Sequence, residues 1–120
     1  MAKRVLLAED DPNIVVSLSF VLERAGYAVV SHANGKDVLA SVLSDPPDVL
    51  ILDVMLPDKN GLEILEAMRA SDTAAHVPVL VLTAKSRRLD QDAAMSSGAN
   101  IFMKKPFSNA EILAAVARLA

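Results

Sequence analysis

The chain has 120 residues, 52% of them hydrophobic and 22% charged, which is the composition of one globular domain spanning residues 1–120. It contains no cysteine, so disulfides, thiolate metal sites and a cysteine nucleophile are excluded. The net charge of −3 leaves no basic footprint for nucleic acid, and no apolar run approaches the roughly 18 residues of a membrane span. We therefore expect a cytoplasmic protein that contacts neither nucleic acid nor membrane.

Five short apolar runs alternate along the chain with amphipathic stretches. Each run is continuously hydrophobic rather than alternating, which is typical of strands covered on both faces, as in a parallel sheet. In chain order the runs are 5–8, 27–30, 49–52, 79–82 and 101–103. The pattern predicts five parallel strands.

The first three stretches between these runs carry clear helix signals. Asp11 and Pro12 form a cap and a first-turn proline, and Gly26 is a stop signal for the same helix. Apolar residues at helical spacing form stripes that predict three buried helix faces. These stripes lie within 14–25, 38–43 and 62–68.

The last two predicted helices differ in strength. The segment at about 87–97 has little apolar bulk, so it is either a helix that opens easily or an ordinary exposed one. The final helix starts at a capping box made by Ser108 and Glu111, and its inward side chains are Ile112, Leu113, Val116 and Leu119. Strands that alternate with helices predict an α/β fold, a doubly wound (βα)5 parallel sheet with right-handed crossovers.

Polar and charged side chains follow four of the predicted strands. In parallel sheets, ligands bind beyond the carboxyl ends of the strands, so we expect these side chains to gather at one edge. Clustered carboxylates repel one another, and either a bound cation or a proton relieves that repulsion. Oxygen donors without cysteine or histidine favour a hard ion, Mg²⁺ above all, with Mn²⁺ as an alternative. The residues are Glu9, Asp10, Asp11, Asp53, Thr83 and Lys105.

A metal, an ammonium and a hydroxyl around one aspartate suit phosphoryl transfer, in which catalysis is mostly positioning and charge neutralisation. Asp53 is the expected nucleophile, because it is the only acid directly after the most apolar strand. The backbone carbonyl of Met55, just past it, would reach the same ion. Taken singly, each residue has a plainer interpretation as a cap, a turn residue or a solubilising charge. If all of those interpretations were correct, residues suited to one phosphoryl-transfer site would follow four different strands by chance.

Four motifs resemble the receiver domain of two-component response regulators. Each motif is weak alone, but their order and spacing are specific together, and the resemblance covers essentially all 120 residues. It implies a flavodoxin-like sheet with strand order 2-1-3-4-5. The motifs are Val-Leu-Leu-Ala-Glu-Asp-Asp-Pro (5–12), Ile-Leu-Asp-Val-Met-Leu-Pro-Asp (51–58), Leu-Thr-Ala-Lys (82–85) and Lys-Lys-Pro-Phe (104–107).

The resemblance also implies a magnesium site and a phosphoacceptor. Asp53 matches the phosphoacceptor of the family. Asp10 matches a direct ligand of Mg²⁺ and Glu9 a ligand through water, with Asp53 and the Met55 carbonyl completing the set. Asp11 then becomes a helix cap, although the sequence leaves it open as a ligand.

A two-state switch follows from the same resemblance. Thr83 matches the switch hydroxyl of the family, and Phe102 matches the switch aromatic. Lys105 matches the phosphate-binding lysine, and the resemblance implies a cis peptide bond between Lys105 and Pro106. A phosphoryl group on Asp53 would attract Thr83, and Phe102 would turn into the vacated space. The surface of the fourth helix, fifth strand and last helix would then change its partners. Ordinary sheet packing is the alternative for Phe102, and without a hydroxyl its outward state should be less favoured than that of tyrosine.

The implied partners are a histidine kinase or a histidine phosphotransfer protein as phosphodonor, and a downstream protein or an output domain beyond Ala120 as target. Such a domain catalyses its own phosphorylation and dephosphorylation and is not a turnover enzyme. The first half of the chain is similar to receivers attached to winged-helix DNA-binding domains. In that subfamily, acidic residues before the switch aromatic and an arginine in the last helix help to build a dimer. This chain has Ala99 and Asn100 before Phe102, and residues 112–116 of its last helix are Ile-Leu-Ala-Ala-Val. We therefore expect a monomer or a weak homodimer.

Three other functions compete with this one. An aspartyl-phosphate phosphatase needs a second acid two residues after its nucleophile, where this chain has Met55. A flavodoxin-like cofactor site needs a phosphate loop after the first strand, where acids would repel a phosphate. A phosphate-independent interaction module would not need acids, a threonine and a lysine together at the strand ends, so their presence argues against that function. Within the receiver interpretation, Lys85 is expected to tune the phosphoryl lifetime, in a direction that the sequence leaves open.

Overall fold

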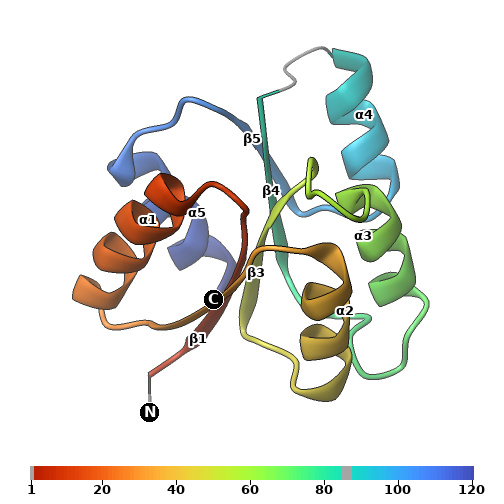
Figure 1. Cartoon of the computed structure of the whole chain (residues 1–120), viewed down its shortest axis with the longest axis horizontal. Helices are drawn as coiled ribbons and strands as arrows, with labels where there is room; N and C mark the ends of the chain where they lie inside the picture. Colours follow the sequence, from red (N-terminus) through yellow and green to blue (C-terminus); the bar gives the residue numbers. More distant parts are fainter. Residues whose placement is uncertain (1, 85–87) are drawn as a thin grey trace.

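Five parallel strands form one sheet in the computed structural model, which describes residues 2–84 and 88–120 (Figure 1). The strand order is β2-β1-β3-β4-β5, and each neighbouring pair is parallel, so the predicted (βα)5 fold and its strand order are confirmed. The strands are β1 (Arg4–Ala8), β2 (Ala28–His32), β3 (Val49–Asp53), β4 (Val79–Thr83) and β5 (Ile101–Lys104).

Helices cover the sheet on both faces, with α1 and α5 on one face and α2, α3 and α4 on the other (Figure 1). None of those in the described ranges combines the length and hydropathy that crossing a membrane requires. The expectation for Lys85, and the predicted helix start at Arg87, fall outside the described residues. The helices are α1 (Pro12–Arg24), α2 (Gly35–Ser44), α3 (Gly61–Arg69), α4 (Arg88–Ser96) and α5 (Asn109–Leu119).

Two hydrophobic cores, one on each face of the sheet, explain the continuous apolar runs. Successive side chains of a strand point to opposite faces. In β3, Val49 and Ile51 pack with α1 and α5, whereas Leu50 and Leu52 pack with α2 and α3. A central strand therefore needs an apolar residue at every position.

The two edge strands, β2 and β5, depart from the prediction that every strand is covered on both faces, because every residue of each is at least partly exposed. Strand β2 lies at the edge beside β1. Val30 is 56% exposed. The strand also begins one residue later than predicted, because the Tyr27 N–H donates to the Leu22 carbonyl and closes the end of α1. The apolar run marks the strand, but only its neighbours decide how much of it is buried.

The predicted capping residues start and stop the helices. Asp11 is the N-cap of α1 and accepts a hydrogen bond from the Asn13 N–H at 2.9 Å. Gly26 follows the same helix with a φ of 99°, a conformation that glycine adopts readily. Ser108 and Glu111 form the predicted capping box of α5 in both directions.

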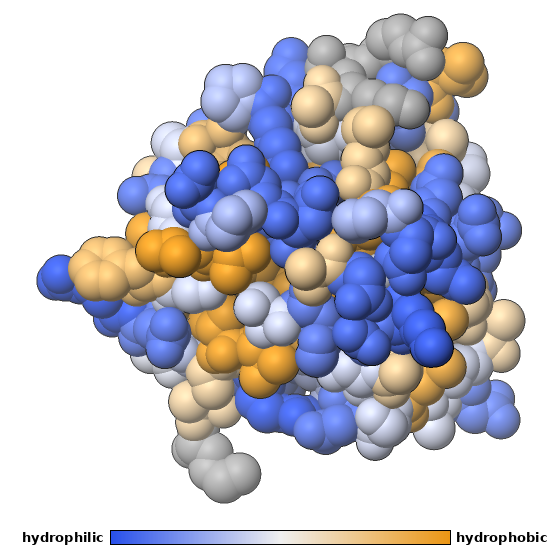
Figure 2. All heavy atoms as spheres, in the orientation of Figure 1, coloured by the Kyte–Doolittle hydropathy of each residue, from blue (hydrophilic) through white to orange (hydrophobic). Residues whose placement is uncertain are grey.

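The face of the molecule seen in Figure 2 is mostly polar, with a group of hydrophobic side chains on its left side and others between charged ones. Single apolar residues on a protein surface are normal and do not by themselves mark a binding site. Among the described residues, the exposed large hydrophobics are Val16, Phe20, Val30, Leu43, Met55, Leu89 and Met95.

The loop between β3 and α3 is anchored to the N-terminus of α2. The Asp58 carboxylate accepts hydrogen bonds from the Gly35 N–H at 2.6 Å and the Lys36 N–H at 3.1 Å. The bond from Gly35 lowers the pKa of Asp58 most. A Cβ on Gly35 would lie 2.5 Å from the Cβ of Lys59, so the close approach needs glycine. This contact holds the chain just past Asp53 in place.

We expect Asp58→Ala to lower the free energy of unfolding at neutral pH, because it removes a carboxylate from a helix N-terminus. A carboxyl group with a lower pKa in the folded than in the unfolded protein stabilises the fold above its unfolded pKa, and this contribution is lost as pH falls through the folded pKa. The difference from wild type should therefore shrink below about pH 4. Urea unfolding over a pH series measures it, with Glu66→Ala on the exposed face of α3 as control. A difference that stays constant into acid would contradict the assignment.

Arg69, at the end of α3, joins the segments that lead into β4 and β5. Its guanidinium donates to the carbonyls of Val77 at 2.7 Å and Gly98 at 2.8 Å, and to the Asn100 side-chain oxygen at 3.0 Å. The same oxygen of Asn100 accepts from the Val79 N–H at 2.8 Å. Burial lowers the pKa of Arg69. These bonds fix the start of β5, the strand that carries Phe102.

Candidate functional site

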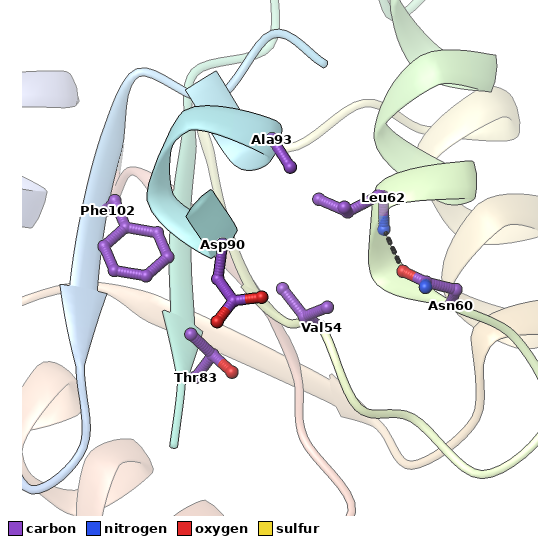
Figure 3. Close-up of a pocket in the computed structure, with 7 residues that line it drawn as sticks. All are labelled: Val54, Asn60, Leu62, Thr83, Asp90, Ala93 and Phe102. Carbon is purple, nitrogen blue, oxygen red and sulfur yellow. Dashed lines mark hydrogen bonds between the residues drawn. The ribbon is translucent and has the colours of Figure 1, made fainter. Parts of the chain in front are cut away.

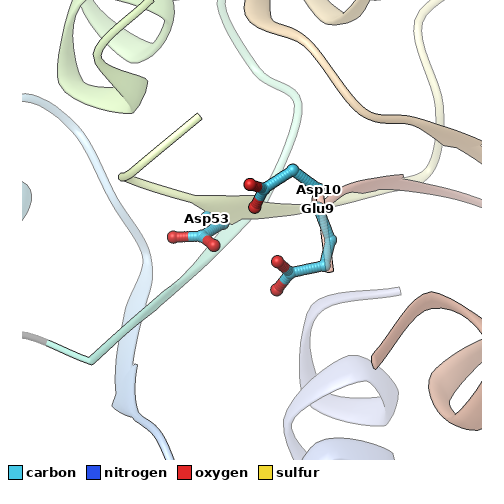
Figure 4. Close-up of side chains that lie close together, drawn as sticks. All are labelled: Glu9, Asp10 and Asp53. Atoms are coloured by element: carbon cyan, nitrogen blue, oxygen red, sulfur yellow. The ribbon is translucent and has the colours of Figure 1, made fainter. Parts of the chain in front are cut away.

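The carboxyl ends of β1 and β3 bring three acids together. Glu9 and Asp10 follow β1, Asp53 ends β3, and one carboxylate oxygen from each lies within 4.8 Å of the others (Figure 4). The two strands are neighbours, with Ala8 opposite Leu52, so the residues that follow these positions meet at the sheet edge. A cluster predicted from separate stretches of sequence is thus a single group in space.

Lys105 lies against two of these acids. Its Nζ donates to Oε1 of Glu9 at 2.7 Å and to Oδ2 of Asp53 at 3.0 Å. Glu9 and Asp53 are only 1% and 5% exposed, whereas Asp10 is exposed. One ammonium therefore bridges two buried carboxylates that would otherwise repel each other.

Burial and this bridge shift the pKa values in the site. Burial raises the pKa of Glu9, and the hydrogen bonds from Lys105 and the Asp11 N–H offset the rise only in part. Burial acts to lower the pKa of Lys105, but its hydrogen bonds to Glu9 and Asp53 outweigh burial and leave the pKa above its ordinary value. Lys105 therefore stays a cation at neutral pH.

The backbone around Asp53 holds its carboxylate in one orientation. The Met55 N–H donates to Oδ1 of Asp53 at 2.9 Å, which leaves Oδ2 facing Lys105. Gly61, at the start of α3, donates its N–H to the Val54 carbonyl at 2.8 Å. A Cβ on Gly61 would lie 2.7 Å from the Cα of Val54, so this close approach of the two backbones needs glycine.

Asp11 takes the role of a cap. Its side chain accepts from the Asn13 N–H, and it lies outside the group of three acids, while its own N–H donates to Oε2 of Glu9 at 3.2 Å. The Lys105–Pro106 peptide bond is cis, in agreement with the expectation from the sequence motif.

The donor set of the three acids fits a hard divalent cation. It consists of carboxylate oxygens, and the exposed Asp10 leaves one side open to water, which Mg²⁺ retains in most of its protein sites. Among the described residues, three acids gather here and Lys105 pairs with two of them, Glu9 and Asp53, so a bound cation would relieve the repulsion that remains. The residues present therefore fit Mg²⁺.

Thr83 and Phe102 line a cavity beside the acidic cluster (Figure 3). Thr83 ends β4 and is 1% exposed, and its carbonyl accepts a hydrogen bond from the Lys105 N–H at 2.8 Å. Phe102 comes from β5, and the cavity has a volume of about 150 Å³. Asp90 of α4 also lines it, and sequence reasoning missed this residue because the weak apolar stripe of α4 does not show which side faces inward.

The family model of the response regulator receiver domain matches residues 5–117, nearly the whole chain. The chain belongs to this family. The order of strands in the sheet is therefore that of a receiver, as the four sequence motifs indicated.

Similar proteins extend this assignment. The receiver is 37% identical over 116 residues to the alkaline phosphatase synthesis transcriptional regulatory protein PhoP of Bacillus subtilis. The match covers 97% of this chain and 48% of PhoP, so the chain spans about half the length of that relative. The chemotaxis response regulator CheY4 of Vibrio cholerae superimposes with a TM-score of 0.93 at 29% identity over all of both chains. The receiver domain of the sensor histidine kinase PA1611 from Pseudomonas aeruginosa superimposes with a TM-score of 0.91 at 28% identity, over 99% of this chain and 98% of that one. That structure holds a magnesium ion coordinated in its active-site cleft.

Proposed function

We propose that this receiver is a phosphoacceptor switch of a two-component phosphorelay, with Asp53 as the residue that accepts the phosphoryl group. The observation that carries the proposal is the bridge from Lys105 to Asp53 and Glu9 beside the acidic cluster. A carboxylate that could act as a nucleophile, an ammonium group and carboxylate oxygens that could bind a metal lie together here, and this supports the proposal. Structural roles alone do not require two buried carboxylates side by side.

The chemistry at Asp53 is a transfer between two nucleophiles. One carboxylate oxygen of Asp53 bonds to phosphorus as the bond from phosphorus to the donor nitrogen breaks, so an acyl phosphate forms on Asp53. The donor is the phosphohistidine of a histidine kinase or of a histidine phosphotransfer protein. Lys105, already in contact with the carboxylate, neutralises charge on the transferred group.

Glu9, Asp10 and Asp53, with the backbone carbonyl of Met55, would hold Mg²⁺, or Mn²⁺ in its place. When bound, the ion supplies positive charge to the phosphoryl oxygens. Glu9 also orients Lys105, through the hydrogen bond of 2.7 Å between them.

The switch follows from the neighbouring cavity. Thr83 donates its hydroxyl to a phosphoryl oxygen, and Phe102 turns into the cavity that both residues line. The surface made by α4, β5 and α5 then changes shape and controls a downstream protein or an output domain. In this role residues 1–120 act as one receiver domain in the cytoplasm, as a monomer or weak homodimer, and not as a turnover enzyme. The net charge of −3 is consistent with protein partners rather than nucleic acid.

Intact mass spectrometry after incubation with Mg²⁺ and acetyl phosphate tests the proposal. We expect the wild type to gain the mass of one phosphoryl group, and a chelator such as EDTA to prevent the gain. Borohydride reduces an acyl phosphate to the alcohol, so peptide mapping should find homoserine at position 53. No gain in mass, or a modified residue elsewhere, would refute the proposal.

A further inference from the structure

The loop between β3 and α3 is held both at its base and at its tip. At the base, Met55 pairs with Asn60 in an isolated antiparallel bridge. At the tip, the Asp58 carboxylate accepts hydrogen bonds of 2.6 Å and 3.1 Å from the N–H groups of Gly35 and Lys36, which begin α2. The loop is therefore closed on itself and tied to a neighbouring helix, which lies beside α3 on the same face of the sheet (Figure 1).

The base of this loop carries two groups that bear on the magnesium site. The Met55 N–H donates to Oδ1 of Asp53 at 2.9 Å and so orients that carboxylate. The carbonyl of the same residue is the backbone ligand proposed for the ion. A loop that changed its path would therefore displace both groups together.

Neither packing nor the capping of α2 accounts for Asp58. Its side chain is exposed, and the apolar anchor of the loop is Leu56, which is 7% exposed and belongs to the same hydrophobic core as Val38 of α2. Helix α2 also has an N-cap from its own segment, because the Asn34 side chain accepts from the Asp37 N–H at 2.9 Å. The bonds to Asp58 thus serve the contact between loop and helix.

We propose that Asp58 is a positioning residue of the magnesium site, which raises the affinity for Mg²⁺ by holding the loop after Asp53 against the N-terminus of α2. This inference rests on the proposed function. Two carboxylate oxygens on two successive N–H groups fix the orientation of the loop tip as well as its position. A loop that is ordered before the ion arrives loses less entropy when the ion binds. Partners that orient metal ligands without touching the metal typically change its affinity about 10- to 100-fold.

Coupling between the ion and this anchor has to act in both directions. If the anchor raises the affinity for Mg²⁺, then Mg²⁺ favours the anchored loop by the same factor. The N–H groups of Gly35 and Lys36 report on the anchor, because both donate to Asp58. The Asp37 N–H is an internal reference, because it lies in the same turn of α2 but donates to Asn34.

Amide hydrogen exchange of ¹⁵N-labelled protein, followed by NMR with and without saturating Mg²⁺, measures this coupling. In the wild type, Mg²⁺ should slow the exchange of Gly35 and Lys36 about tenfold, and that of Asp37 much less. In Asp58→Asn, Mg²⁺ should no longer slow the first two. The proposal is overturned if the wild type shows no slowing, if all three amides slow alike, or if the slowing persists in the variant.

Isothermal titration calorimetry gives the Kd for Mg²⁺ in matched variants. Asp58→Asn keeps the size of the side chain and should raise the Kd about tenfold. Asn34→Ala removes the cap of the same helix, so it should lower stability but leave the Kd at the wild-type value. Glu63→Gln removes a negative charge from the groove that Met55 and Asp58 also line, and it should likewise leave the Kd unchanged. A rise in either control as large as that in Asp58→Asn would assign the effect to helix stability or to charge, and would overturn the proposal.

The outcomes distinguish this inference from the function on which it rests. A wild type that binds no Mg²⁺, or that gains no phosphoryl group from acetyl phosphate, would refute the proposed function and this inference with it. A wild type that gains the phosphoryl group, together with an Asp58→Asn variant of unchanged Kd, would refute the role of Asp58 alone. If the role is correct, saturating Mg²⁺ should bring phosphoryl uptake by Asp58→Asn back to the wild-type rate, because the variant lowers only the affinity for the ion.

Discussion

Replacing Asp53 with asparagine is expected to abolish phosphoryl uptake and to leave the protein at least as stable as the wild type. The amide is not a nucleophile, so no acyl phosphate forms. The substitution also removes one of three carboxylates whose oxygens lie within 4.8 Å, and this relieves their repulsion. Lys105 keeps its hydrogen bond of 2.7 Å to Glu9, so the ammonium is not left unpaired. Loss of activity with unchanged or raised stability separates a functional carboxylate from a structural one.

Mass spectrometry and thermal unfolding with and without Mg²⁺ measure both parts of this prediction. An ion that binds only the folded state stabilises it by about 2.7 kcal/mol at a concentration of 100 times its Kd. Asp53→Asn should lose part of this gain because it removes one ligand. Asp72→Asn, an exposed acid in the loop after α3, is the control and should behave as the wild type. A phosphoryl group still found on Asp53→Asn would move the acceptor to another residue.

Replacing Lys105 with methionine is expected to slow phosphoryl uptake about 100-fold, the usual effect of removing one group that stabilises transition-state charge. It should also lower the free energy of unfolding without Mg²⁺ by about 1–3 kcal/mol, because Glu9 and Asp53 remain buried without a cation. Methionine keeps most of the length of the lysine side chain. The loss is therefore one of charge rather than of packing.

Magnesium distinguishes the two effects of this substitution. The ion replaces the missing positive charge, so it should restore most of the stability of Lys105→Met, but not the rate of uptake. Urea unfolding and a time course of intact mass measure the two quantities. Lys104→Met is the matched control, since Lys104 is exposed and adjacent. Equal rates for the two variants would show that Lys105 takes no part in the transfer.

Local signals in the sequence were sufficient for most of the fold. A strand covered on both faces needs an unbroken apolar run, and β3 and β4, which are buried at every position, have such runs. Capping depends on residues three positions apart, which is why the Ser108–Glu111 box is visible in the sequence. Burial of β2 and β5 was overestimated, because an apolar run does not show whether a strand lies at the centre or the edge of a sheet.

The contacts that organise the site lie beyond such local patterns. Asp58 reaches Gly35 across 23 positions of the sequence, and Lys105 reaches Glu9 across 96. The inward position of Asp90 has no sequence signal, since the short helix α4 has almost no apolar stripe to orient it. Neighbouring elements place each of these side chains.

By itself, the sequence determined the order of strands and helices, the family of the chain and the residues able to carry the chemistry, because these depend on hydrophobic period, capping and motif spacing. Only the tertiary structure decided which of those residues touch. It showed that Lys105 bridges two buried carboxylates, that Asp11 turns away to cap a helix, and that Thr83 shares its cavity with an acid. The physical reason is that electrostatic energy depends on distance and burial, which the packing of strand ends and helices sets.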